Sequence, residues 1–111
     1  MSINLDAYYR GLAADYQKKR DMLAEALTEG GFRPFVPQGA YYMLAEIPPS
    51  FASASEAAAS LIEEARVASV PGPSFYASGA GDRLLRFCFA KDFGALEEAC
   101  NRLMAFRSAM A

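Results

Sequence analysis

One arginine lies in the middle of an otherwise apolar segment. Arg86 interrupts the run Leu84-Leu-Arg-Phe-Cys-Phe-Ala90, and a run of this composition is typical of a buried strand. The guanidinium group stays protonated in proteins, so burying it without an anionic partner is very unfavourable. Because side chains alternate along a strand, Cys88 and Ala90 share the face of Arg86, and their small size predicts open space beside the charge. A planar cation beside a hollow could bind both oxygens of a carboxylate.

Two simpler interpretations fit the same residues. Arg86 could be an exposed arginine on an edge strand, or it could pair with an acidic side chain of the same chain, as in a domain with only a scaffold role.

Other reactive groups are scarce. The chain contains no histidine, which removes the commonest general base, the commonest metal ligand and every Ser-His or Cys-His arrangement. Its two cysteines, Cys88 and Cys100, are expected on a strand and in a helix as buried thiols, and they support neither a disulfide nor a zinc site. We therefore predict no metal site in this chain.

The composition describes a globular protein. Of its 111 residues, 53% are hydrophobic and 22% are charged, and the net charge is −2. This balance argues against nucleic-acid binding. No apolar run approaches the roughly 18 residues of a membrane span, and the first residues lack the pattern of a signal peptide, so we expect a cytoplasmic protein. The high apolar share for so short a chain suggests that part of its surface is covered by something else, and we expect a homo-oligomer, most simply a dimer.

The periodicity of the chain predicts the elements that must position Arg86. Apolar residues at three- and four-residue steps, with Tyr9 and Leu12 among them, form a stripe that predicts a long helix over 6–29, ended by two glycines. A proline-containing edge strand over 32–37 and a turn at 38–40 come next. The remaining prediction is a strand over 41–47, a helix over 54–65 opened by a capping pair of Ser53 and Glu56, a strand over 67–70, a loop over 71–82, the Arg86 strand over 84–90 and a helix capped by Asp92.

This order predicts a single domain over 1–111 of the α/β (α+β) class. We expect a two-layer sandwich in which a small mixed sheet carries helices mainly on one face, with a long N-terminal helix. Tyr41 and Tyr42 should point to opposite faces of their strand, one into the core and the other toward a hollow.

Four segments resemble one known family. Each matches a motif of the C-terminal small domain of pyridoxal-phosphate aminotransferases of fold type I, classes I and II, in the same order and at similar spacing: Tyr16–Leu23, Pro37–Tyr42, Val67–Tyr76 and Leu85–Ala90. The run from Arg86 to Asp92 is further similar to the kynurenine–oxoglutarate and methionine aminotransferase branch. The resemblance covers nearly the whole chain.

The resemblance implies a role for specific residues. In that family the arginine that matches Arg86 binds the α-carboxylate of the amino acid and of the 2-oxo acid, and positions matching Gly39, Ala40 and Tyr41 lie near the mouth of the active site. The cofactor, pyridoxal 5'-phosphate, is held by a preceding large domain that this chain lacks, and Lys18, Lys19 and Lys91 do not match the family's cofactor-binding lysine. The resemblance thus implies a fragment that carries the substrate-binding arginine, has no catalytic residue and no cofactor-binding residue of its own, and is inactive alone. The alternative is a stand-alone α/β module that binds an amino acid as a ligand or regulator.

Overall fold

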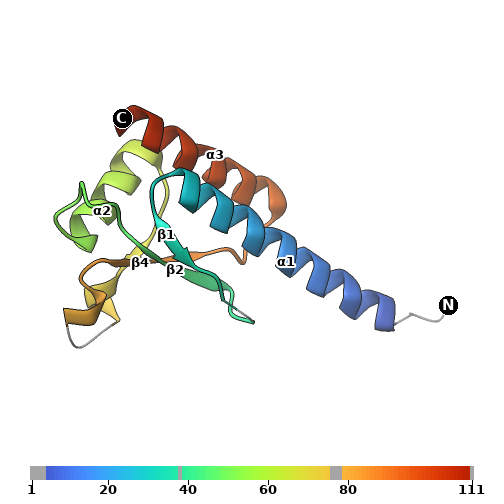
Figure 1. Ribbon diagram of the computed structural model, residues 1–111. Helices are drawn as coiled ribbons and strands as arrows, with labels where there is room; N and C mark the ends of the chain where they lie inside the picture. The colour runs from blue at the N-terminus through green and yellow to red at the C-terminus, as the bar shows by residue number, and fades with distance from the viewer. Residues whose placement is uncertain (1–4, 38, 76–78, 111) are drawn as a thin grey trace.

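Three helices and a small sheet form two layers. The computed structural model describes residues 5–37, 39–75 and 79–110. The main elements follow in the order α1 (Leu5–Glu29), β1 (Arg33–Phe35), β2 (Tyr42–Glu46), α2 (Ala54–Ser60), β3 (Val70–Pro71), β4 (Leu84–Cys88) and α3 (Phe93–Met110). Helices α1 and α3 lie side by side over one face of the sheet (Figure 1). The predicted two-layer α/β architecture with a long first helix is therefore confirmed.

The sheet differs from the prediction in its strand directions. The strand order is β1-β2-β4-β3, and all three pairs among the described strands are antiparallel, whereas we expected a mixed sheet. Strands β2 and β3, which the segment with α2 connects, do run in the same direction, because each is antiparallel to β4. Because β4 inserts between those two strands, no parallel pair forms.

Alternation along the strands divides the sheet into a core face and an open face. Leu85, Phe87 and Phe89 are at most 2% exposed, as predicted, and they face the helices together with Met43 on β2. The register pairs Leu44 with Arg86, and directly paired residues of antiparallel strands share a face. Arg86 therefore lies on the face of the sheet opposite the core.

Helix α1 is buried only over its later turns. Leu23 and Leu27 are at most 2% exposed, whereas Tyr9 and Leu12, which we placed on the apolar stripe, are 62% and 48% exposed. The first half of α1 extends past the sheet and past α3 (Figure 1), which accounts for a longest dimension of 56 Å. The apolar stripe is real, but no other described element is long enough to cover its first half.

The segment from α2 to β3 shows how local hydrogen bonds move element boundaries. The Oγ of Ser53 accepts from the amide of Glu56, which confirms the Ser53 half of the predicted capping pair. Among the described residues, the Glu56 carboxylate makes no return bond to the Ser53 amide. The predicted helix over 54–65 changes into a π-helical turn at Leu61–Ala65. The amide of Val67 then donates to the Leu61 carbonyl oxygen at 3.1 Å. That residue therefore belongs to the helix end, and strand β3 begins only at Val70.

The last predicted helix begins as expected, since the amide of Ala95 donates to the Asp92 carboxylate at 2.8 Å. None of the helices in the described ranges has both the length and the apolar run needed to cross a membrane. Gln38 of the predicted turn and residues 76–78 of the predicted loop lie outside the described residues.

Candidate functional site

Arg86 occupies an interior position of the sheet. It pairs with Leu44 of β2 on one side and with Val70 of β3 on the other. The interpretation of Arg86 as an edge-strand arginine is therefore wrong. That interpretation failed because strand order is set by pairing between distant segments, which the local sequence does not reveal.

Two aromatic rings contact the guanidinium group of Arg86. Its central carbon lies 5.4 Å from the centroid of the Tyr42 ring and 5.1 Å from that of Phe75. These two residues, named here the aromatic pair, come from the segments on either side of β4, and Arg86 is partly buried. Cation–π contacts of this kind restrict the orientation of the group. A guanidinium carries five N–H donors in its own plane.

No acidic side chain neutralises Arg86. All thirteen Asp and Glu residues of the chain fall within the described ranges. The two ion pairs in those ranges join Arg20 to Asp21 and Arg102 to Glu98. The interpretation in which Arg86 pairs with an internal acid is therefore contradicted, and a partly buried cation remains without an acidic side-chain partner in the described structure.

The other predicted site residues lie against α1. The Gly39 amide donates to the Tyr16 hydroxyl oxygen at 2.7 Å, and that hydroxyl donates to the Ala40 carbonyl oxygen at 2.8 Å. The ring of Tyr41 lies 5.3 Å from that of Tyr16 and 6.1 Å from that of Phe89. A hollow of about 390 Å³ borders these groups, with Leu12, Ala13, Gln17 and Arg20 completing its wall.

The structure thus groups the predicted residues differently from the sequence. Of the two neighbouring tyrosines, Tyr42 contacts Arg86, and Tyr41 packs against Tyr16 and Phe89. Tyr41 is 54% exposed and Tyr42 is 49% exposed, so the prediction that one of them enters the core is wrong. Sequence reasoning left open which tyrosine lines a hollow, and it did not select Phe75. The alternation along β2 could have indicated Tyr42, which pairs with Cys88 on the face of Arg86, whereas Phe75 comes from a loop whose path no periodicity reports.

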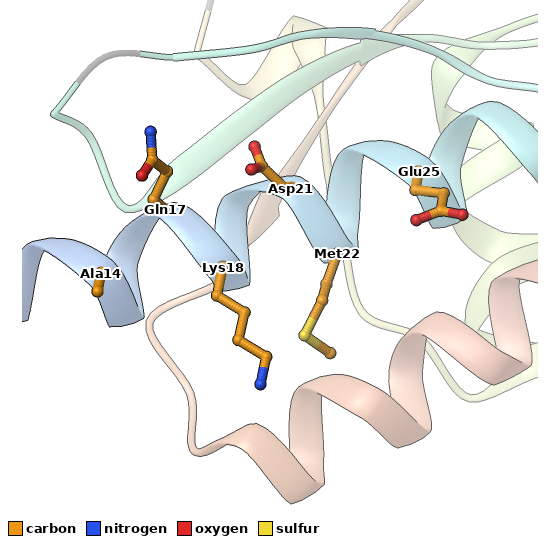
Figure 2. Close-up of a pocket in the computed structure, with 6 residues that line it drawn as sticks. All are labelled: Ala14, Gln17, Lys18, Asp21, Met22 and Glu25. Carbon is orange, nitrogen blue, oxygen red and sulfur yellow. The ribbon is translucent and has the colours of Figure 1, made fainter.

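A hollow of about 400 Å³ along α1 does not form a comparable site. Figure 2 shows that Gln17 and Asp21 point to the opposite side of the helix from Lys18 and Met22. The Lys18 ammonium lies over the ring of Phe93 at 5.2 Å. Polar groups that diverge in this way cannot hold one ligand, so this hollow is a surface groove along α1.

The two cysteines have different environments. Cys100 is 5% exposed, and burial, with smaller contributions from the carboxylates of Glu25 and Glu97, raises the pKa of its thiol. Cys88 is exposed on the open face of the sheet, so the prediction that both thiols are buried is wrong for Cys88. Among the described residues, no three His, Cys, Asp or Glu side chains are grouped so as to hold a metal ion.

Comparison with known proteins identifies the family. The family described as "Aminotransferase class I and II" matches residues 3–103. The chain belongs to the class I and II aminotransferases. The resemblance inferred from the four sequence motifs is therefore confirmed.

Individual aminotransferases are similar to this chain over only part of their own length. The chain is 33% identical to the LL-diaminopimelate aminotransferase of Nitratidesulfovibrio vulgaris over 98 residues, which are 88% of this chain and 25% of that protein. It is 27% identical to the kynurenine–oxoglutarate transaminase of Dictyostelium discoideum over 124 residues, covering 94% of this chain and 28% of that protein. It superposes on an aromatic aminotransferase from Pyrococcus horikoshii with a TM-score of 0.80 and 28% identity, covering 91% of this chain and 26% of the other. The chain thus spans about a quarter of the length of these aminotransferases.

Proposed function

We propose that this chain is the substrate-binding segment of a longer pyridoxal-phosphate-dependent aminotransferase, and that Arg86 binds the α-carboxylate of the substrate. The proposed reaction is reversible transfer of an amino group from an amino acid to a 2-oxo acid. The observation that carries the proposal is the placement of Arg86, a partly buried cation in the middle of the sheet, contacted by two rings and paired with no acidic side chain in the described structure.

The residues of this chain do not fit the cofactor itself. Both ammonium groups of Lys18 and Lys19 lie over the ring of Phe93, at 5.2 and 4.8 Å from its centroid, on the helix layer of the molecule. Arg86 lies on the other side of the sheet, and Lys91 is exposed beyond the end of β4. In the proposed protein a preceding segment holds the cofactor, which supplies the chemistry at the substrate's α-carbon.

The contribution of this chain is therefore binding and orientation. Two in-plane N–H groups of Arg86 can donate to the two oxygens of one carboxylate, which fixes the direction of the substrate as well as its position. Tyr42 and Phe75 restrict the guanidinium plane before the substrate arrives, so less freedom is lost on binding. Orientation of this kind can contribute several kcal/mol to lowering a reaction barrier.

The proposal is tested with the longest open reading frame that contains residues 1–111. We expect some hundreds of codons upstream and a product that transfers amino groups from an amino acid to a 2-oxo acid. Arg86→Leu should lower kcat/KM by about 100-fold or more, because a charged two-point contact is lost. Arg86→Lys should lower it less, since an ammonium group retains the charge without the planar geometry.

The matched control is Arg33→Leu, because Arg33 lies on the same face of the sheet and also contacts a ring, that of Phe35 at 6.0 Å. It should leave kcat/KM within about twofold. A reading frame that begins at residue 1, or a longer product without amino transfer, would favour the stand-alone module. Unchanged kcat/KM in Arg86→Leu would remove the proposed role of Arg86.

The 111-residue chain alone provides a second test. Mixed with pyridoxal phosphate, it should form only loose adducts that dialysis removes. A stable stoichiometric absorbance band would contradict the assignment of the cofactor site to another segment.

A further inference from the structure

The hydroxyl of Tyr16 joins two segments that are far apart in the sequence. It accepts a hydrogen bond from the amide of Gly39 at 2.7 Å, 23 residues away, and donates one to the carbonyl oxygen of Ala40 at 2.8 Å. The N–H···O distance is at the short end of the usual range, and the O–H···O distance is typical. One side-chain oxygen therefore satisfies two backbone groups of the turn that precedes β2.

The turn depends on this support because its backbone is unusual. Gly39 has a φ of +106°, a conformation that residues with a Cβ atom rarely adopt. A Cβ built at Gly39 would meet no atom within 4 Å, so the backbone conformation, and not a lack of space, requires glycine. Glycine is the residue with the greatest freedom in the unfolded chain, and the Tyr16 hydroxyl is the side-chain group that holds its amide.

The Tyr16 ring packs against two further aromatic rings. Its centroid lies 5.3 Å from that of Tyr41 and 5.4 Å from that of Phe89. The amide of Phe89 in turn donates to the Tyr41 carbonyl oxygen at 2.9 Å. Tyr41 directly precedes Tyr42, whose ring contacts Arg86. A continuous set of contacts thus leads from α1 through the turn to the ring that restricts the guanidinium group.

We propose that Tyr16 is a positioning residue: its hydroxyl fixes residues 39–41, and through them the Tyr42 ring that orients Arg86 toward the substrate carboxylate. This inference rests on the proposed function, because it gives the turn a role in substrate binding. Tyr16 itself need not touch the substrate.

The first test measures the turn directly in the 111-residue chain. Tyr16→Phe keeps the ring contacts and removes both hydrogen bonds. Amide hydrogen exchange followed by NMR should be at least about tenfold faster at Gly39 in this variant, because its hydrogen-bond acceptor is gone. Tyr9→Phe is the matched control, since Tyr9 is on the same helix and 62% exposed, and it should leave the exchange rate of Gly39 unchanged. Equal Gly39 rates in Tyr16→Phe and in the unaltered chain would overturn the inference.

The second test separates positioning from a purely structural role in the longer aminotransferase. Tyr16→Phe should raise the KM for the amino acid about three- to tenfold and leave kcat within twofold, because the carboxylate contact is weakened without loss of the reacting groups. Tyr9→Phe should change neither constant. If Arg86→Leu lowers kcat/KM but Tyr16→Phe leaves KM unchanged, the positioning role fails and the proposed function stands. If Arg86→Leu itself has no effect, the proposed function fails, and the role given to Tyr16 fails with it.

Discussion

Replacing Tyr42 with leucine isolates the contribution of one ring to the placement of Arg86. The ring centroid lies 5.4 Å from the guanidinium carbon, and Arg86 is partly buried. Cation–π contacts are worth about 0.5–1 kcal/mol at exposed sites and about 2 kcal/mol when both groups are removed from water. A partly buried contact should fall between these limits, so we expect about 1 kcal/mol of coupling between Tyr42 and Arg86.

A double-mutant cycle measures this coupling. Tyr42→Leu, Arg86→Met and the double variant are unfolded with urea, and the coupling is the difference between the double and the summed single effects. The same cycle on Arg33 and Phe35, which are both exposed on the same face, should give about 0.5 kcal/mol, the lower end for exposed contacts, because their separation of 6.0 Å is at the outer limit for such contacts.

The aromatic pair should also affect catalysis in the longer protein. If Tyr42→Leu weakens substrate binding by about 1 kcal/mol, the KM for the amino acid should rise about fivefold. Phe75→Leu should act similarly. A Tyr42–Arg86 coupling no larger than that of the control cycle would refute the claim that the ring holds the guanidinium group in place.

Further predictions concern the elements around the site. Gly72→Ala should destabilise the chain by about 3 kcal/mol or more, because the added Cβ would lie 1.8 Å from the Gly81 carbonyl oxygen. The control Gly11→Ala, whose Cβ would meet no atom within 4 Å, should stabilise α1 by about 0.5–1 kcal/mol. Unfolding in urea measures both changes, and equal effects would contradict the close approach at Gly72. Arg83 donates to the carbonyl oxygens of Pro48, Phe51 and Ala52, so Arg83→Met should lower the free energy of unfolding by about 2 kcal/mol. Arg10 is an exposed donor to the Asp6 carbonyl oxygen, and the control Arg10→Met should lower it by less than about 0.5 kcal/mol. An effect of Arg83→Met as small as that of Arg10→Met would show that these bonds contribute little. Iodoacetamide should modify the exposed Cys88 before the buried Cys100. Because the pKa of the Cys100 thiol is raised in the native state, the native state keeps a proton that the unfolded state loses, and the free energy of unfolding should fall as the pH rises above about 8.5. Cys100→Ala should lessen that fall, and an identical pH dependence in this variant would contradict the reasoning.

The local patterns of the sequence predicted the core face of the sheet and the helix caps. Leu85, Phe87 and Phe89 follow the two-residue period of a strand and are buried together. Ser53 and Asp92 are recognised by side-chain chemistry that acts over three residues. Signals of this range do not depend on how distant segments pack.

The features that the sequence did not predict depend on distant segments. The interior position of Arg86 follows from the insertion of β4 between β2 and β3, and the position of Phe75 follows from the loop that leaves β3. The periodicity of α1 indicated an apolar stripe at Tyr9 and Leu12, but periodicity cannot tell whether another element is long enough to cover it. The Arg86 site was thus visible in the sequence as a charge in an apolar strand, and its aromatic surroundings were not.

A structure of the longer aminotransferase with a bound amino-acid analogue or 2-oxo acid would show directly whether Arg86 binds the substrate. We expect both oxygens of the α-carboxylate to lie about 3 Å from in-plane nitrogens of Arg86, with Tyr42 and Phe75 still against the guanidinium group. A ligand whose carboxylate is held by other groups, with Arg86 pointing elsewhere, would contradict this expectation.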